Sequence, residues 1–208
     1  MKIKSSGVQK VYGLTGKYCA GKNLAGRLLE EAGCLVIDVD KLGHYVLEKE
    51  KQTIVGRFGS GILAPDGKID RSKLGAIVFS DRRALKELEA IVHPGAVART
   101  REIIKENSQK TPGQVVIINA ALLFPSGLYR DCSRVLWVWA PLLVRLRRGR
   151  QRDKLNAIAV LKRIFSQKKL SLQLWKKHAD IYTVSNPGSE ESLARELMCF
   201  FESEGLLD

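Results

Sequence analysis

The sequence lacks any apolar stretch long enough to cross a lipid bilayer. One of its longest apolar runs, VLWVWAPLLV from Val135 to Val144, is about half of the roughly 20 residues that a transmembrane helix needs. The first ten residues, MKIKSSGVQK, contain no apolar segment of the kind found in secretory signal peptides. We therefore expect a soluble, cytoplasmic protein with no membrane partner.

Cysteine is scarce, and its spacing does not suit metal binding. The four cysteines, Cys19, Cys34, Cys132 and Cys199, lie far apart in the chain, and no two of them form a C-x-x-C pair. This pattern indicates neither a zinc site nor a disulfide framework. We expect reduced thiols, most of them packed in the interior.

Acidic residues are almost absent from one part of the chain. Between Arg145 and Lys177, twelve lysines and arginines accompany a single acid, Asp153, so this segment carries most of the formal net charge of +13. Such a segment attracts the phosphates of a nucleic acid or of a small molecule, or it forms an ordinary solvated helix face. Its only aromatic residues are Phe165 and Trp175, which disfavours base stacking. We expect no nucleic-acid partner.

The sequence does contain short apolar runs that alternate with helical patterns. With 208 residues, of which 45% are hydrophobic, the chain can bury a substantial core. Five of the runs are typical of buried strands. They are Val8–Gly16, Cys34–Asp38, Gln114–Ala120, Arg134–Ala140 and Ile181–Asn186. Because strands that alternate with helices form parallel sheets, we predict an α/β fold of three layers around a five-stranded parallel sheet.

Helical patterns occupy the segments between the predicted strands. From Lys41 to Asn107 the pattern is helical apart from a turn at Ala64–Arg71 and the proline at position 94. Since proline fits the first turn of a helix but not its interior, we expect one helix to end near Val92 and another to begin around Pro94. Four further helices are expected. They are Asn23–Gly33, Pro141–Arg152, about Asn156–Ala179, and Ser189–Ser203.

The stretch GLTGKYCAGKN contains a phosphate-binding motif that departs from its pattern at the last position. The pattern G-x-x-x-x-G-K-[ST] is met by Gly16, Gly21 and Lys22, whereas Asn23 replaces the serine or threonine. The loop follows a predicted strand and opens a predicted helix, so backbone N–H groups and the helix dipole both favour a bound phosphate. Lys22 would reach the terminal phosphates, and the amide oxygen of Asn23 could ligate Mg²⁺. Lys17 contacts phosphate or points to solvent.

Two carboxylates come at the end of the second predicted strand. Asp38 and Asp40 are spaced i and i+2, so on a continuing strand both would point to one face, at the edge of the sheet where α/β proteins bind ligands. A carboxylate at this place can hold Mg²⁺ or accept the proton of a reacting hydroxyl. Alternatively, Asp40 caps a helix that begins at Lys41.

The segment RLRRGRQRD supplies guanidinium groups that suit phosphoryl transfer, because they stabilise the charge on the transferring group. The five arginines of this segment cannot all face inward from one helix. We select Arg148 and Arg152, which are four residues apart and therefore lie on one helix face.

The order of these motifs resembles the dephospho-CoA kinase family, whose members use ATP to phosphorylate the ribose 3′-hydroxyl of dephospho-coenzyme A. The resemblance covers nearly the whole chain. It rests on the strings GLTGKYCAGKN, VIDVDKLGH, DGKIDRSKLGAIVFSD, LEAIVHP, VVIINAALLFPSGLY, VLWVWAP, RLRRGRQRD, RIFSQ and HADIYTVSNPG. It implies ATP and Mg²⁺ as cofactors and dephospho-CoA as the small-molecule substrate, and we expect a monomer or weak homo-oligomer.

The family resemblance also implies how the chain is organised and which residues act. It implies a single P-loop kinase domain with a core at residues 8–40, 112–140 and 178–208, a helical CoA-binding subdomain at about 41–108, and a basic lid at about 141–177. Asp40 would be the catalytic base, assisted by Lys22 and Arg152. The residues expected to bind ATP and its phosphates are Gly16, Lys17, Tyr18, Cys19, Ala20, Gly21, Lys22, Asn23, Leu24, Arg148, Arg152 and Asn186. Those expected to bind the acceptor substrate are Asp40, His44, Asp70, Arg71 and His93, and those expected to bind the metal are Asn23 and Asp38.

The chain departs from the family pattern at three places. Asn23 stands where the family has serine or threonine, His44 stands where it has arginine, and ALLFP at Ala121–Pro125 stands where it has P-L-L-F-E. Two alternative functions stay open beside phosphorylation of dephospho-CoA. One is another or a catalytically impaired P-loop kinase, acting on a nucleoside or a shikimate-like alcohol. The other is a basic nucleic-acid-binding protein with a vestigial phosphate loop.

Overall fold

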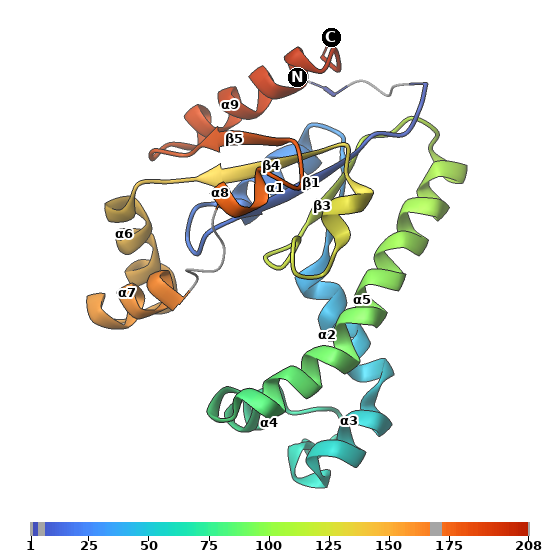
Figure 1. The fold of residues 1–208 in the computed structure, drawn as a ribbon, viewed down its shortest axis with the longest axis vertical. Coiled ribbons are helices and arrows are strands. Elements are labelled where there is room, and N and C mark those ends of the chain that lie inside the picture. The colour runs from blue at the N-terminus through green and yellow to red at the C-terminus, as the bar shows by residue number, and fades with distance from the viewer. Residues whose placement is uncertain (1, 4–6, 167–171, 208) are drawn as a thin grey trace. The chain divides into compact units, whose positions relative to one another are not determined.

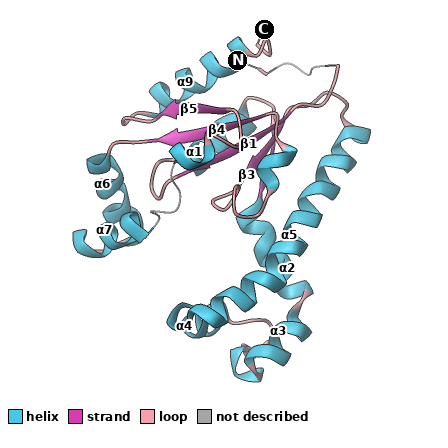
Figure 2. Ribbon diagram, viewed as in Figure 1, coloured by secondary structure: helices cyan, strands magenta, loops and turns pink. Residues whose placement is uncertain are grey.

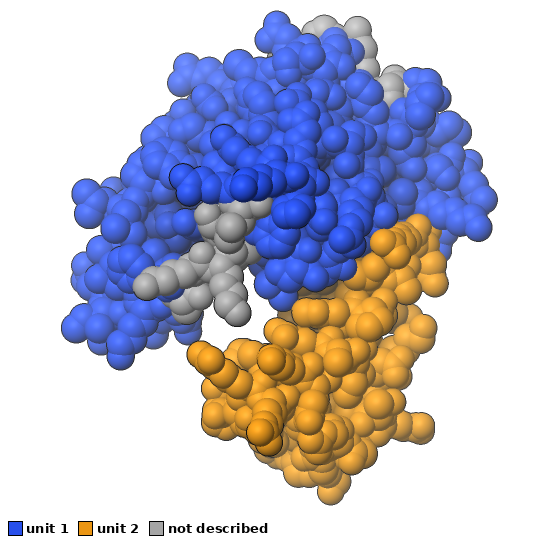
Figure 3. Space-filling view, in the orientation of Figure 1, with its two compact units in different colours: residues 1–38, 104–208 blue, residues 39–103 orange. Residues whose placement is uncertain are grey.

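The fold is that of a computed structural model of the chain, which describes residues 2–3, 7–166 and 172–207. The chain divides into two compact units, shown in Figure 3. Unit 1 consists of residues 1–38 and 104–208, and unit 2 consists of residues 39–103. Each unit has a hydrophobic cluster of its own.

Unit 1 is built around a five-stranded sheet, shown in Figure 1. The strands are β1 (Val11–Gly16), β2 (Leu35–Asp38), β3 (Val116–Asn119), β4 (Arg134–Trp139) and β5 (Ile181–Ser185). Their order across the sheet is β2-β3-β1-β4-β5, and every neighbouring pair is parallel. The predicted α/β fold with a five-stranded parallel sheet is therefore confirmed. Since all strands run the same way, their carboxyl ends form one edge of the sheet, and the loop that follows the central strand β1 begins there.

Helices surround the sheet in unit 1 and make up most of unit 2 (Figure 2). Those of unit 1 are α1 (Lys22–Glu31), η2 (Leu128–Asp131), α6 (Leu142–Asp153), α7 (Ala157–Ser166), α8 (Leu172–Trp175) and α9 (Glu190–Ser203). Unit 2 contains α2 (Val39–Lys49), α3 (Lys51–Phe58), η1 (Ser60–Ile62), α4 (Arg71–Ser80) and most of α5 (Arg82–Lys110). Among the residues described, no helix combines the length and the apolar character that a bilayer span requires.

The strand side chains alternate between the two faces of the sheet. On one face, the fully buried Tyr12 of β1 belongs to the core that α1 and α9 cover, and its ring meets Phe200 edge-on with centroids 5.2 Å apart. On the other face, Trp137 of β4 lies 6.5 Å from Phe124, whose ring stacks on Trp175 of α8 at 4.5 Å. The sheet is thus covered on both faces, as its apolar strands predict.

A polar cluster ties the C-terminal end of α9 to the strands. Glu204 accepts hydrogen bonds from the hydroxyl of Tyr12 at 2.6 Å and from Nη1 of Arg134 at 2.9 Å. Burial alone would raise the pKa of Glu204, but the bonds from Tyr12 and Arg134 outweigh it and hold that pKa below its ordinary value. The carboxylate is therefore an ionised part of the folded structure.

The helix α5 runs without a break through Pro94, so the expected interruption near Val92 is wrong. Proline removes one backbone donor and crowds the preceding turn, which costs about 3 kcal/mol in a helix interior. Tertiary packing within unit 2 outweighs this local preference. An added Cβ on Gly95 would lie 2.7 Å from Val46 Cγ1, and Ala96 is buried in the next position.

The predicted helix over about Asn156–Ala179 differs from the structure. The described part of this segment contains two helices, α7 and α8, and α8 ends at Trp175. Residues 176–179 form a turn, and residues 167–171 lie outside the described residues.

All four cysteines are free thiols, as expected from their spacing. Burial raises the pKa of Cys34 and of Cys132 to about 12, and it also raises the pKa of Cys19. Cys199, on α9, is exposed. Cys199 is therefore the thiol that solvent reaches most readily.

Candidate active site

The phosphate loop (residues 16–24) turns tightly between β1 and α1. The backbone of Cys19 has a φ of 57° and that of Gly21 a φ of 103°, both in the left-handed region. An added Cβ on Gly21 would overlap Nδ2 of Asn186, and one on Gly16 would lie 2.6 Å from the carbonyl oxygen of Val138. Glycine at both positions is thus required by close approach, and at position 21 also by conformation.

The helix α1 begins at Lys22, directly after this turn, and no side chain caps its N-terminus in the described structure. The first N–H groups of a helix lack intrahelical partners and carry the positive end of the helix dipole. Asn23 is exposed in this first turn, and Leu24 is half-buried beside it. The loop therefore has the form of an anion-binding site.

Two predicted nucleotide-binding residues hold the loop, Arg148 from α6 and Asn186 from the end of β5. The carbonyl oxygen of Ala20 accepts hydrogen bonds from Asn186 Nδ2 at 2.8 Å and from Arg148 Nη1 at 3.3 Å. Arg148 also donates from Nη2 to Asn186 Oδ1 at 2.9 Å and to the carbonyl oxygen of Gly188 at 3.2 Å. Asn186 is completely buried. Arg148 and Asn186 thus fix the position of the loop backbone.

A second cluster joins the loop to α6 and α7. The hydroxyl of Tyr18 donates to the carboxylate of Asp153, which also accepts hydrogen bonds from Arg152 Nε at 2.7 Å and from Arg163 Nη1 at 2.6 Å. These hydrogen bonds hold the pKa of Asp153 far below its ordinary range. The hydrogen bond from Arg152 contributes most to this lowering of the pKa. The guanidinium of Arg152 also lies 5.0 Å from the centroid of the Tyr18 ring. Beside the same ring, an added Cβ on Gly149 would be 3.2 Å from Tyr18 Cε1.

Sequence reasoning missed Arg145, a third arginine that contacts the loop. Its side chain donates from Nε to the carbonyl oxygen of Tyr18 at 2.8 Å and is 7% exposed. Arg145, Arg148 and Arg152 are spaced i, i+3 and i+7, which places them along one helix stripe. This spacing could have identified Arg145 from the sequence. The prediction considered only the four-residue interval between Arg148 and Arg152.

The residues predicted to hold a metal are hard oxygen donors in unit 1. Asp38 ends β2 and is paired in register with Asn119, the last residue of β3. Asn119 is buried, and its Oδ1 has no hydrogen-bond partner in the described structure. The described residues contain no group of three or more His, Cys, Asp or Glu suited to a metal ion. Mg²⁺ bound with a nucleotide needs only one or two protein ligands beside phosphate and water, so Asn23 and Asp38 fit its chemistry.

The structure corrects the argument made for Asp40. The strand β2 ends at Asp38 and α2 begins at Val39, so Asp38 and Asp40 are not alternate residues of one strand. The capping alternative is also wrong, because a helix that begins at Val39 already includes Asp40 in its first turn. The backbone passes from strand to helix without a linker, which changes the side-chain period from two to 3.6 residues. Asp40 lies in unit 2, where its charge is favourable at the N-terminus of α2.

The other predicted acceptor-binding residues also lie in unit 2. Arg71 Nη1 is 3.1 Å from His44 Nδ1. A guanidinium can only donate a hydrogen bond, so Nδ1 is the acceptor in this contact. Asp70 caps α4, its Oδ1 accepting from the backbone N of Ser72 at 2.9 Å. His93 is half-buried on α5. The structure thus brings Arg71 and His44 together.

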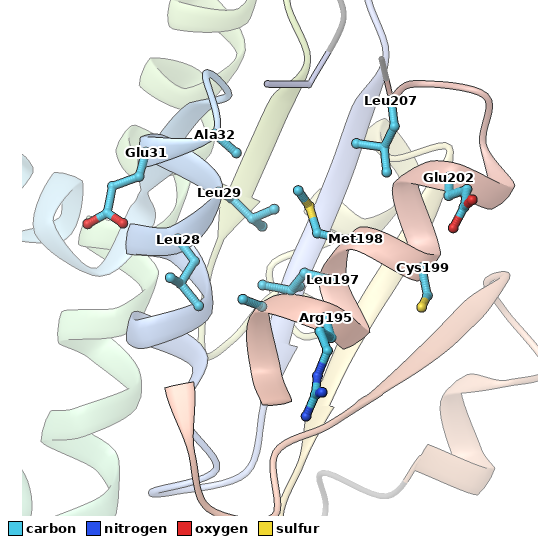
Figure 4. Close-up of a pocket in the computed structure, with 11 residues that line it drawn as sticks. Leu28, Leu29, Glu31, Ala32, Arg195, Leu197, Met198, Cys199, Glu202 and Leu207 are labelled. Atoms are coloured by element: carbon cyan, nitrogen blue, oxygen red, sulfur yellow. The ribbon is translucent and has the colours of Figure 1, made fainter. Parts of the chain in front are cut away.

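A cavity of about 760 Å³ in unit 1 does not coincide with the phosphate loop. It lies between α1 and α9, and Figure 4 shows Leu28, Leu29, Leu197 and Met198 among the side chains that line it. None of the residues predicted to act on ATP or the acceptor borders this cavity. It is therefore a surface hollow between two helices, at the end of α1 opposite the loop.

The comparison with known proteins decides which phosphate-loop protein this is. A family model described as dephospho-CoA kinase matches residues 10–191. The chain belongs to the dephospho-CoA kinase family. The dephospho-CoA kinase of Treponema pallidum strain Nichols is 33% identical over 202 residues, which cover 94% of this chain and 95% of that protein. The dephospho-CoA kinase of Fusobacterium nucleatum subsp. nucleatum is 35% identical over 195 residues, covering 93% and 97%.

A solved structure shares the fold of this chain. The crystal structure of a Thermus thermophilus protein matches with a TM-score of 0.75 at 31% identity, and the match covers 94% of this chain and 98% of that one. The sheet and the phosphate loop of this dephospho-CoA kinase family member therefore belong to a fold shared over nearly the full length of both chains.

Proposed function

We propose that the protein transfers the terminal phosphoryl group of ATP to the ribose 3′-hydroxyl of dephospho-coenzyme A, giving coenzyme A and ADP in the last step of coenzyme A biosynthesis. The observation that carries this proposal is the family match over residues 10–191 together with the glycine turn that leads into the N-terminus of α1 near the start of the matched region. In this proposal the protein acts on small molecules in the cytoplasm, as a monomer or weak homo-oligomer, and without a nucleic-acid partner.

In this proposal the phosphate loop binds the triphosphate of ATP. Backbone N–H groups at the start of α1 surround the phosphates, and Lys22 neutralises their terminal charge. Arg152 would stabilise the negative charge of the transferring phosphoryl group. Its position over the ring of Tyr18, a loop residue, suits this role. Arg148 and Asn186 keep the carbonyl of Ala20 turned away from the phosphates, since both donate to it.

Asn23 and Asp38 are the residues that would hold Mg²⁺. When bound, the ion would neutralise negative charge that develops on the phosphate oxygens during the transfer. Asn119 supports the same assignment, because its unpartnered Oδ1 lies on the strand paired with Asp38.

In this proposal the acceptor substrate binds to the helical subdomain at about 41–108. The basic segment at about 141–177 forms the lid. Asp40 would accept the proton of the 3′-hydroxyl as it attacks the terminal phosphorus. Arg71 would bind acidic groups of dephospho-CoA, with His44 orienting its guanidinium through the 3.1 Å contact. Asp70 and His93 complete the set of predicted acceptor residues.

The test is a coupled assay of ADP release with and without dephospho-CoA. We expect ADP release to require dephospho-CoA and Mg²⁺. An Asp40→Asn variant should lose about 10²–10⁴-fold in kcat while its Kd for ATP stays unchanged, because a general base acts in the chemical step and not in nucleotide binding. Asp66→Asn, at an exposed acid of unit 2, is the matched control and should be as active as the parent.

Two outcomes would refute parts of this proposal. An Asp40→Asn variant as active as the parent would remove Asp40 from the chemical step. A panel of acceptor alcohols that includes nucleosides and shikimate tests the substrate. If one of these alcohols, and not dephospho-CoA, drives ADP release, then the protein is a P-loop kinase of different specificity.

A further inference from the structure

Arg145 occupies an electrostatically unfavourable position. It lies in the first turn of α6, at the positive end of that helix dipole, and only 7% of the residue is exposed. No carboxylate pairs with it anywhere in the described residues, in contrast to Arg152, which pairs with Asp153. Burial of the unpaired guanidinium accordingly lowers the pKa of Arg145. A buried cation without a counterion opposes folding, so its presence calls for a compensating anion.

The geometry shows where that anion would be. Arg145 Nε donates to the carbonyl oxygen of Tyr18, inside the phosphate loop, at 2.8 Å. Its Nη2 is buried and has no hydrogen-bond partner in the part of the chain that the structure describes. Because the guanidinium is rigid and planar, Nη2 lies within about 5 Å of the same carbonyl. An unsatisfied positive group therefore lies directly against the loop backbone, next to the left-handed residue Cys19.

We propose that Arg145 is a positioning residue of the phosphate site, whose buried charge is compensated by the polyphosphate of the bound nucleotide. Through Nε it holds the carbonyl of Tyr18 away from the phosphates and so fixes the turn at Cys19. Its charge acts on the phosphates through the protein interior, where solvent screens it weakly. The identity of the nucleotide as ATP rests on the proposed function, whereas the requirement for a polyphosphate rests on the loop itself.

Two substitutions separate the charge of Arg145 from its hydrogen bond. In Arg145→Gln the amide nitrogen stands at the same distance along the side chain as Nε, so the bond to Tyr18 can persist without the charge. In Arg145→Lys the charge persists without the planar fork. The matched control is Arg147→Gln, which removes a charge from the exposed face of the same helix.

The experiment measures the Kd for ATP by calorimetry, with Mg²⁺ and without dephospho-CoA, together with the Tm of each variant in the absence of nucleotide. We expect Arg145→Gln to weaken ATP binding about tenfold or more, since a buried charge interacts strongly with a triphosphate nearby. Its Tm without nucleotide should equal or exceed that of the parent, because an uncompensated buried charge has been removed. Arg145→Lys should bind ATP within a few-fold of the parent, and Arg147→Gln should match the parent in both measurements.

Two results would overturn the proposal. One is ATP binding by Arg145→Gln that is as tight as that of the parent. The other is a lower Tm without nucleotide for both Arg145→Gln and Arg145→Lys with equal losses of affinity, which is the behaviour of a purely structural residue. Failure of the proposed function gives a different result: the parent would bind ATP with the expected dependence on Arg145 and yet release no ADP when dephospho-CoA is added.

Discussion

Replacing Gly21 with alanine should damage the phosphate loop in two ways that can be measured separately. The first is backbone strain, because a φ of 103° is unfavourable for any residue with a Cβ. The second is displacement of Asn186, whose Nδ2 the new methyl group would overlap. Asn186 is fully buried and cannot move aside without losing its bonds to Ala20 and Arg148.

The size of each contribution follows from these contacts. Strain at such a residue costs about 1–3 kcal/mol. Disrupting the buried hydrogen bonds of Asn186 costs about 1–3 kcal/mol more, because their partners are left unsatisfied. Gly21→Ala should therefore lower the free energy of unfolding by about 2–6 kcal/mol, which for a chain of this length lowers Tm by roughly 4–24 °C.

A double-mutant cycle with Asn186→Ala separates the two contributions. Asn186→Ala removes the side chain that the new methyl group meets, so in that background Gly21→Ala should cost only the strain. The coupling measured by urea denaturation should then be about 1–3 kcal/mol, with the double variant more stable than the sum of the single effects predicts. Equal costs of Gly21→Ala in both backgrounds would refute the assigned contact, and no cost in either would refute the left-handed turn itself.

Two further predictions concern pH and thiol reactivity. The pKa of Glu204 is lower in the folded state than its ordinary value of 4.5, so its stabilising contribution is full above that pH and is lost as pH falls through the folded pKa. Between about pH 5 and pH 3 the parent should therefore lose more stability than Glu204→Gln, as measured by urea denaturation at each pH, and parallel curves would contradict this. At pH 7.5 a thiol reagent should modify one cysteine per native chain rapidly, and Cys199→Ser should abolish that phase, because burial raises the pKa of the other three thiols. A rapid phase that survives in Cys199→Ser would show that one of the other three thiols reacts readily, which would contradict this prediction.

The sequence predicts the sheet well because its strands are short, continuous apolar runs with glycine or polar residues at their ends. Their parallel pairing follows from the alternation with helices, whereas the order β2-β3-β1-β4-β5 is seen only in the structure. The helix through Pro94 could not be predicted in this way. Its continuity depends on the packing of Gly95 against Val46, and these two residues are far apart in the sequence. Local rules for proline describe the cost of such a helix but not what compensates for it.

The sequence also predicts some parts of the candidate site and not others. The motif predicts the loop from Gly16 to Leu24, and the structure places Arg148, Arg152 and Asn186 against it, while their roles in binding ATP stay predictions. Because α2 begins directly after β2, the two-residue spacing of a strand does not apply to Asp38 and Asp40. Arg145 was missed because only the four-residue interval between Arg148 and Arg152 was considered, and the wider spacing that places Arg145 on the same helix stripe was not used.

The contact between Tyr18 and Asp153 joins positions that are 135 residues apart in the chain. The tyrosine ring also lies against the backbone of Gly149, where a side chain would meet both Tyr18 and Val160. These positions form one steric unit, so evolution cannot alter them independently. Relatives with smaller residues in place of both Tyr18 and Val160 are free to carry a larger one in place of Gly149, and an alignment of many such chains should show the three positions covarying.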